Sequence, residues 1–351
     1  MISLRYHCAC IPDERTQRHR LSAAYIWVAA ADATLHYLST CTIGCIRVTA
    51  LLLALWPLFA LIVAGYFLRL REFPSEAFWP GAERINYFVL FPALLFSSLA
   101  TAPLDNPALP RLAGAVMLGL GLAWLGLLLV KRVRGWPAAR FGAFAQGALR
   151  FNTYLGLAAV GSLFGKEGLA LAALMLALMV PTVNVMSVWA LTAERGVSMR
   201  SLLLPILKNP LILACLAGAV INLSGLGLPG GSDRLLSLLA AASLPLGLLC
   251  VGAALKPREL GGEIPALGWN SVLRLLAVPL LAFAVALAVD LPAMETTILV
   301  LFFALPTAPT AYVLTRQLGG DSRLMAGIIT LQTLLAAASL PLVLTLLNGH
   351  A

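Results

Sequence analysis

Histidine and acidic residues are scarce in this sequence of 351 residues. The chain has 4 histidines, none of them between residues 37 and 349, and 15 acidic residues against 24 lysines and arginines. It contains no His-Glu-x-x-His, Gly-x-Ser-x-Gly or Walker A motif. Zinc chemistry, intramembrane proteolysis and ATP-driven pumping therefore lack the residues that they usually need. We accordingly predict that the protein is not an enzyme and has no bound metal or cofactor.

Charged residues of either sign make up only 11% of the chain, whereas hydrophobic residues make up 60%. Soluble domains do not have this composition, which is typical of a polytopic membrane protein. The net charge of +9 would suggest a nucleic-acid partner for a soluble protein. Here the basic residues lie in short loops between apolar stretches, where they determine membrane topology. We therefore predict the lipid bilayer as a partner, and no nucleic acid.

The first 48 residues differ from the rest of the chain. They hold three of the 4 histidines and no uninterrupted apolar span, because Asp32 and His36 divide the most apolar stretch. Four of the six cysteines lie here, in a spacing that matches no standard metal-ligand pattern, whereas Cys215 and Cys250 are predicted to be small core residues. We expect residues 1–48 to be a poorly ordered extension or a mis-assigned start, with the folded chain beginning near Val48.

The remainder divides into apolar stretches that are each long enough to cross a bilayer. A window of about 19 residues predicts ten spans, near residues 50–68, 84–101, 111–130, 142–164, 169–191, 206–224, 234–255, 267–289, 294–315 and 324–347. The loops after spans 1, 3, 5, 7 and 9 hold 14 lysines and arginines, and those after spans 2, 4, 6 and 8 hold 3. Because cytoplasmic loops are enriched in positive charge, this distribution predicts that both termini lie outside the cytoplasm.

The two halves of the membrane region are similar at an offset of 153 residues. The matched pairs are Pro57 with Pro210, Gly65 with Gly218, Pro92 with Pro245 and Ala100 with Ala253. Each half has five spans, an odd number, so the second half must enter the membrane from the opposite side. The sequence therefore predicts an all-α fold of ten transmembrane helices in two inverted five-helix repeats, residues 49–191 and 192–351.

Two of these spans are interrupted at corresponding places. In span 9, residues 302–314 read FFALPTAPTAYVL and carry two prolines, each of which costs roughly 3 kcal/mol in a helix interior. The offset of 153 overlays this segment on span 4, which reads RFNTYLG over residues 150–156. Broken spans at matching positions are the best sequence indication of a transporter's substrate site. We predict that helices 4 and 9 cross at their breaks, although prolines and glycines can also simply kink a membrane helix.

The broken segments supply polar groups and unwound backbone for binding. Hydroxyls would come from Thr153, Thr307 and Thr310, an amide from Asn152, and the unwinding from Gly156, Pro306 and Pro309. The N-terminal ends of half-helices favour an anion, and their C-terminal ends favour a cation.

Polar side chains inside the spans are the other candidates. Arg150 could hold a carboxylate with two parallel hydrogen bonds, or its side chain could snorkel to the membrane surface. Arg274 is expected to snorkel. Asn184 and Gln332 are amides at midspan, which could bind substrate or join helices. Asn86 and Tyr87 could line a site or anchor the helix at the membrane surface.

Acidic side chains are missing from the middle of every predicted span. Asp290 and Glu295 lie at a junction between spans, and Glu167 and Asp321 lie in loops. A carboxylate proton relay of the kind found in many pumps is therefore not visible.

Four segments together resemble the auxin efflux carrier family, in particular its bacterial branch with malonate-type carriers. They read INYFVLFPALLFSSLA (85–100), RFNTYLGLA (150–158), KNPLILACLAGAVIN (208–222) and LPTAPTAYVLTRQLGGD (305–321). The resemblance implies a ten-helix fold with helices 4 and 9 crossing, often as a homodimer, that moves organic anions by alternating access. The family's crossover positions would correspond to Asn152, Thr153, Tyr154, Gly156, Pro306, Thr307, Pro309 and Thr310. Plant members usually have a proline in the first crossover, where this chain has Tyr154-Leu155-Gly156, so auxin itself is not the implied substrate.

We conclude from the sequence that the protein is a carrier for a small organic anion, a mono- or dicarboxylate, in the bacterial inner membrane. One alternative is a sodium-coupled symporter resembling the bile-acid class, which normally has acidic or additional polar ion ligands beside the crossover. Another is a membrane-embedded sensor or enzyme, for which an output domain or catalytic side chains would be needed.

Overall fold

The computed structural model describes residues 52–102, 107–192, 194, 208–228, 230–261 and 263–348. All regular elements in this part of the chain are helices. The predicted all-α class is therefore confirmed for it, while the predicted extension, residues 1–48, lies outside the described residues. Cys215 and Cys250 are buried, as predicted.

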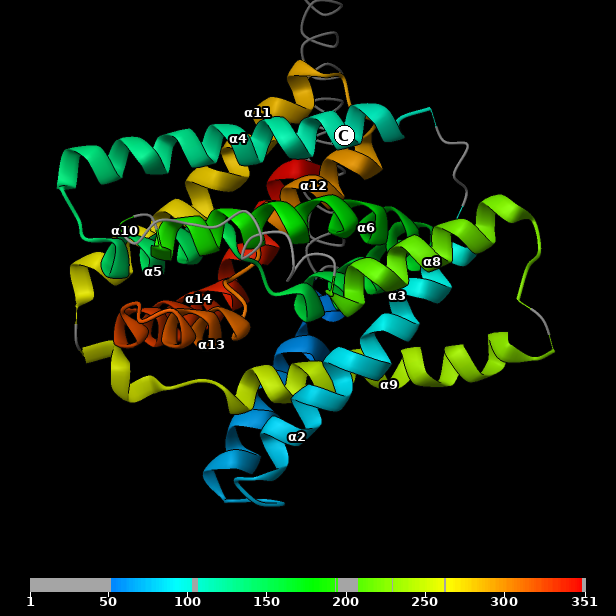
Figure 1. Cartoon of the computed structure of the whole chain (residues 1–351), viewed down its shortest axis with the longest axis horizontal. Coiled ribbons are helices and arrows are strands. Elements are labelled where there is room, and N and C mark those ends of the chain that lie inside the picture. The colour runs from blue at the N-terminus through cyan, green and yellow to red at the C-terminus, as the bar shows by residue number, and fades with distance from the viewer. Residues whose placement is uncertain are drawn as a thin grey trace, which may run out of the picture. The chain divides into compact units, whose positions relative to one another are not determined.

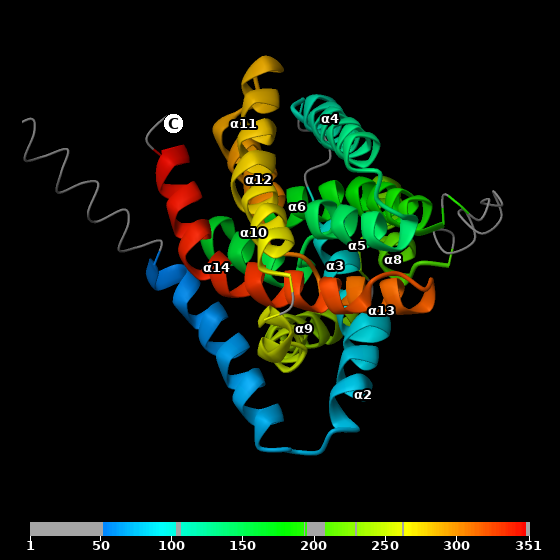
Figure 2. The same ribbon diagram turned by 90° about the vertical axis from the view of Figure 1, so that its left-hand side faces the viewer.

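The first half of the described chain contains a helix over Leu52–Leu70 and then six further elements, of which the five α-helices are labelled in Figure 1. These are α2 (Phe78–Ile85), η1 (Asn86–Leu90), α3 (Phe91–Ala100), α4 (Leu109–Arg134), α5 (Ala138–Leu149) and α6 (Thr153–Thr192). The helix Leu52–Leu70 (blue) descends in Figure 2 to a loop from which α2 returns. The long α6 contains a kink at Gly165, whose φ of 59° is left-handed.

The second half of the described chain continues with further helices. They are α8 (Pro210–Ser224), α9 (Ser232–Ala253), η2 (Pro257–Gly261), α10 (Ile264–Val272), η3 (Leu273–Ala277), α11 (Val278–Ala288), α12 (Ala293–Ala304), α13 (Thr310–Gln317) and α14 (Ser322–Asn348). Helix α3 packs against both α8 and α9 (Figure 1).

Six helical stretches in the described residues are long and apolar enough to cross a membrane. They are Leu52–Leu70, Leu109–Arg134, Ala138–Thr192, Ser232–Ala253, Ile264–Ala288 and Ser322–Leu347, and Pro210–Ser224 and Ala293–Ala304 are shorter apolar helices. A polytopic membrane protein is consistent with these lengths. The count of ten spans and their inverted arrangement stay predictions.

The predicted interruptions of spans 4 and 9 are confirmed. Helix α5 ends at Leu149, the next residue, Arg150, is extended (φ −70°, ψ 146°), and α6 begins at Thr153. Helix α12 ends at Ala304 and Leu305 is extended (φ −64°, ψ 144°). Leu305 takes this conformation because a residue that precedes a proline is disfavoured in the helical region. The chain re-enters a helix at Thr310, directly after Pro309.

Two further prolines give rise to short π-helical segments inside otherwise continuous helices. Segment η1 comes just before Pro92 and η3 just before Pro279. A proline has no N–H to donate and its ring crowds the carbonyl of the preceding turn, so the helix widens locally. The wider turns carry Tyr87 and Arg274, which lie near the two helix breaks.

Glycines allow the helix Leu52–Leu70 to meet α9 backbone to backbone. A Cβ on Gly65 would lie 2.0 Å from the Leu249 carbonyl oxygen, and one on Gly252 would lie 1.8 Å from the Ile62 carbonyl oxygen. Such small-residue contacts are typical of membrane helices, whose association depends on close packing.

Candidate functional site

The two helix breaks lie against each other, as the sequence predicts. The Asn152 N–H donates a hydrogen bond of 2.8 Å to the Pro306 carbonyl oxygen. The Asn152 side chain, which is fully buried, accepts from the Leu155 N–H at 3.1 Å and so satisfies a backbone donor in the first turn of α6. The breaks are therefore joined through their own backbones.

Arg274 binds the C-terminal ends of both broken helices. Its guanidinium donates to the Ala148 carbonyl oxygen of α5 at 3.0 Å, to that of Phe302 in α12 at 3.0 Å and to that of Leu305 at 2.6 Å. The expectation that Arg274 snorkels is wrong, because the residue is only 2% exposed. The ends of two helices offer carbonyls without intrahelical partners, and a cation is favourable there.

A network of amides and a hydroxyl reinforces the same crossing. The Gln332 Oε1 atom accepts from the Thr307 N–H at 2.9 Å, and its Nε2 donates to the Gly147 carbonyl oxygen at 3.0 Å and to Asn270 Oδ1 at 2.9 Å. Asn270 in turn donates to the Phe144 carbonyl oxygen at 2.8 Å. Helices α14 and α10 thus hold the broken segments in place, and this network is fully buried at Thr307, Gln332 and Asn270.

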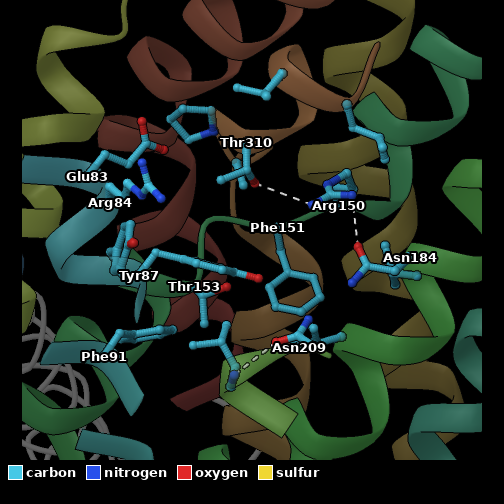
Figure 3. Close-up of a pocket in the computed structure, with 18 of the residues that line it drawn as sticks. Glu83, Arg84, Tyr87, Phe91, Arg150, Phe151, Thr153, Asn184, Asn209 and Thr310 are labelled. Atoms are coloured by element: carbon cyan, nitrogen blue, oxygen red, sulfur yellow. Dashed lines mark hydrogen bonds between the residues drawn. The ribbon is translucent and has the colours of Figure 1, made fainter. Parts of the chain in front are cut away.

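A cavity of about 400 Å³ lies beside the N-terminal ends of the two helices that follow the breaks, α6 and α13. One wall comes from α2, η1 and α3, with Glu83, Tyr87 and Phe91, and the opposite wall carries Arg150 and Asn184 (Figure 3). The first residues of α6 and α13 and the residues around the start of α8 complete the lining. The volume lies within the range of small-molecule binding sites, which is ~300–1,000 Å³.

Arg150 is the polar centre of this cavity. Its Nη1 donates to Asn184 Oδ1 at 3.0 Å and its Nη2 donates to Thr310 Oγ1 at 3.3 Å, so the guanidinium is held by two neighbouring helices (Figure 3). Each terminal nitrogen of a guanidinium carries a second N–H, which can bind a ligand. The N-termini of α6 and α13, represented by Thr153 and Thr310, line the same space and add partial positive charge. The arrangement favours an anion.

Most of the remaining cavity wall is apolar. Phe88, Phe91 and Phe151 contribute aromatic rings, and Val180, Val183, Leu211, Val313 and Leu314 contribute aliphatic side chains. The lining thus combines a guanidinium at the Arg150 end with walls that are mostly apolar.

The structure divides the predicted site residues into two groups. Those that line the cavity are Arg150, Thr153, Tyr154, Asn184, Pro309 and Thr310. Those that do not line it are Asn152, Gly156, Pro306, Thr307 and Gln332, which join or shape the breaks instead. At Gly156 a Cβ would approach Leu305 Cδ1 to 2.6 Å, so a larger residue would require the Leu305 side chain to shift. Whether the predicted residues bind substrate stays a prediction.

Several lining residues were not predicted as site residues from the sequence. Glu83, Arg84, Asn209 and Gln317 line the cavity, as does Tyr87, for which the sequence allowed either a site or an anchoring role. Asn209 carries a recognisable signal, because it precedes Pro210 at the start of α8 and its side chain accepts from the Leu211 N–H at 2.9 Å. The others lie at helix ends and bear no pattern that distinguishes them from loop residues.

Comparisons with known proteins agree with a role in transport. A family model described as "Membrane transport protein" matches residues 50–344. An uncharacterized transporter of Methanothermobacter thermautotrophicus is 26% identical over 293 residues, which cover 80% of this chain and 93% of the relative. An uncharacterized transporter of Methanocaldococcus jannaschii is 22% identical over 288 residues, which cover 78% of this chain and 91% of the relative.

Proposed function

Because the chain belongs to the membrane transport protein family, that of the auxin efflux carriers, we propose that it is a secondary transporter for a small organic anion. The substrate is a mono- or dicarboxylate, and transport proceeds by alternating access. The observation that carries this proposal is the position of Arg150, which lies at the meeting point of two helix breaks and faces a cavity together with two helix N-termini. A carboxylate can accept parallel hydrogen bonds from a guanidinium and gains further from the helix dipoles.

Two pairs of related contacts support an inverted repeat. The offset of 153 residues places Gly65 on Gly218 and Leu249 on Phe96. A Cβ on Gly65 would lie 2.0 Å from the Leu249 carbonyl oxygen, and one on Gly218 would lie 2.6 Å from the Phe96 carbonyl oxygen. The contact between the first helix and α9 thus has its counterpart between α8 and α3, with the roles of the two halves exchanged.

The second pair consists of side chains that bind carbonyl groups at a helix end. Arg69 donates to the Ala253 carbonyl oxygen at 2.6 Å. At the same offset Arg69 corresponds to Asn222, which donates to the carbonyl oxygens of Leu99 at 2.9 Å and of Ala102 at 2.7 Å, on either side of Ala100, the counterpart of Ala253. An exchange of this kind is expected when two copies of one unit pack around a pseudo-twofold axis.

The loops near the cavity indicate which side of the membrane it opens to. Arg84, Asn209 and Gln317 line the cavity and adjoin loops after spans 1, 5 and 9, which carry the excess of lysine and arginine. Positive loops are cytoplasmic. We therefore assign the structure to an inward-open state of a carrier in the bacterial inner membrane with both termini outside the cytoplasm. The homodimer implied by the family resemblance is part of this proposal.

Counterflow in proteoliposomes tests the function. Vesicles loaded with unlabelled malonate or benzoate are diluted into the labelled acid, with and without sodium. We expect exchange of a carboxylate that does not need sodium. The Arg150→Ala variant should raise the KM by about tenfold or more, because it removes a charge-assisted contact worth roughly 1.5–3 kcal/mol.

The matched control is Arg132→Ala, which removes an exposed arginine in the last turn of α4. It should keep the KM of the wild type. Unchanged kinetics in Arg150→Ala would refute the assigned role of Arg150, and an absolute requirement for sodium would favour a sodium-coupled symporter. Absence of exchange for every carboxylate tested would argue against an anion carrier altogether.

A further inference from the structure

Glu83 brings a carboxylate to the cavity that the sequence did not lead us to expect. It lies in the last turn of α2, one helical turn before Tyr87, and lines the wall opposite Arg150 (Figure 3). Within the described part of the chain it is the one acidic side chain that lines the cavity. The substrate anion would therefore share its cavity with a fixed carboxylate.

The pairing of Glu83 differs from that of several other glutamates. Glu76 pairs with Arg69, Glu263 with Arg140 and Glu259 with Arg323. No ion pair joins Glu83 to any other described residue. A half-buried carboxylate without a paired cation is the group in such a cavity that most readily accepts a proton.

The charged and titratable groups around Glu83 come from several elements. They are Arg84 on α2, Tyr87 on η1, Tyr154 on α6, Cys250 on α9 and, across the cavity, Arg150. Tyr154 and Cys250 lie near the Glu83 carboxylate, and neither a phenol nor a thiol carries a positive charge that could pair with it. Arg84, which is exposed, and Arg150 carry the positive charge.

These charges couple a bound anion to the protonation of Glu83. An ionised Glu83 repels a carboxylate that binds at Arg150, and protonation removes this repulsion without removing the attraction of Arg150. Linkage then requires that anion binding favours protonation of Glu83 by the same factor by which protonation favours anion binding.

We propose that Glu83 is a proton-binding site that couples carboxylate transport to proton transport. The Glu83 carboxylate takes up one proton from the side to which the cavity is open when the anion binds, and it releases that proton on the other side when the anion leaves. A monocarboxylate moved in this way carries no net charge across the membrane. This inference rests on the transport function proposed above.

Uptake driven by a pH gradient tests the coupling. Proteoliposomes of the wild type and of Glu83→Gln receive labelled benzoate or malonate with and without an acidic outside, after each protein has been assayed by counterflow at equal pH. We expect the gradient to stimulate wild-type initial uptake by about tenfold. The ratio of uptake with and without the gradient should fall to near one in Glu83→Gln, whatever its rate of exchange.

Glu76→Gln is the matched control, because it makes the same change at an exposed glutamate only seven positions away. It should keep the wild-type ratio. A Glu83→Gln variant that responds to the gradient like the wild type would overturn the assignment of Glu83. Absence of counterflow in the wild type would instead contradict the transport function.

A binding measurement tests the proposal even if the Glu83→Gln variant does not transport. It determines how many protons the protein takes up when an anion binds. Benzoate and malonate are titrated into the purified proteins by calorimetry, near pH 6, in two buffers with different ionisation enthalpies. The wild type should take up close to one proton for each anion bound, and Glu83→Gln should take up close to none. Binding to the wild type without proton uptake would overturn the proposal.

Discussion

At the scale of single residues, the crossing of the broken helices separates into a binding side and a structural side. Arg150 faces the cavity, where its bonds to Asn184 and Thr310 leave N–H groups for a ligand. Arg274 is also an arginine, yet its guanidinium donates to the carbonyl oxygens at the C-terminal ends of α5 and α12. Arg274 is surrounded by backbone carbonyls and joins helices, whereas Arg150 binds no backbone carbonyl in the described part of the chain and keeps N–H groups for a ligand.

Replacing Arg274 by methionine should destabilise the protein strongly. The variant leaves three buried carbonyls at two helix ends without their donor, and we expect the free energy of unfolding to fall by about 2–4 kcal/mol. Arg274→Lys should recover only part of this loss, since one ammonium group cannot reach all three carbonyls with the geometry of a guanidinium. Thermal unfolding of the purified protein in detergent measures the change.

Arg111→Met provides the control for this prediction. Arg111 is exposed and donates a single bond of 2.8 Å to the Asp290 carbonyl oxygen. Its loss should change the stability by less than about 0.5 kcal/mol. Equal melting temperatures for Arg274→Met and Arg111→Met would show that Arg274 does not hold the breaks together.

At the scale of elements, proline and glycine have two different structural effects. Pro306 and Pro309 interrupt a helix, and Pro92 and Pro279 widen one into a π-helical turn. Gly252, in contrast, lies in regular helix and allows another helix to approach. The first kind of residue changes the path of its own chain, whereas the second kind permits a contact with a distant one.

The close approach at Gly252 predicts a large effect of one methyl group. Gly252→Ala would place a Cβ 1.8 Å from the Ile62 carbonyl oxygen, and no side-chain motion can relieve a clash with backbone. We expect a loss of about 1–3 kcal/mol in the free energy of unfolding, measured by thermal unfolding in detergent. Gly126→Ala in α4, where a Cβ meets nothing within 4 Å, should leave the stability equal or slightly higher. A loss of similar size in both variants would exclude backbone contact as the cause.

At the scale of the whole molecule, the proposed orientation of the cavity rests on the distribution of lysine and arginine among the loops. The residues at the mouth of the cavity adjoin the loops that carry most of the positive charge. In the orientation proposed above, an anion that enters from the cytoplasm would meet this positive region before it reaches Arg150. The proposed topology and the proposed inward-open state therefore both require the positively charged loops to lie on the cytoplasmic side of the membrane.

Cysteine labelling tests that sidedness. In a background without native cysteines, Ser75→Cys and Asp233→Cys introduce single thiols at exposed positions on loops or helix ends assigned to opposite sides. A membrane-impermeant maleimide should label Asp233→Cys in intact cells or right-side-out vesicles and Ser75→Cys only in inverted vesicles. The reverse labelling pattern would show that the topology is the opposite of the one proposed. Labelling of both thiols from one side would contradict the predicted number of spans between Ser75 and Asp233.

The sequence by itself determined the class of the protein and the places where its helices break. Hydrophobic composition requires a membrane environment, and two prolines three residues apart in an apolar span disfavour a continuous helix, so both features are local properties of the chain. The breaks made Thr310 a candidate site residue, and Arg150 and Asn184 were candidates as polar side chains inside apolar spans; all three line the same cavity.

Only the tertiary structure decided which polar groups face the cavity and which serve the crossing. Gln332 and Thr307 looked like site residues, and Arg274 looked like a surface residue, because a single chain does not reveal which distant carbonyls lie near a side chain. Glu83 lies at the edge of a predicted span, and only the fold places α2 at the same cavity as the first residues of α6 and α13. Side-chain burial and pairing depend on contacts between helices that are far apart in sequence, and these contacts form only in the folded protein.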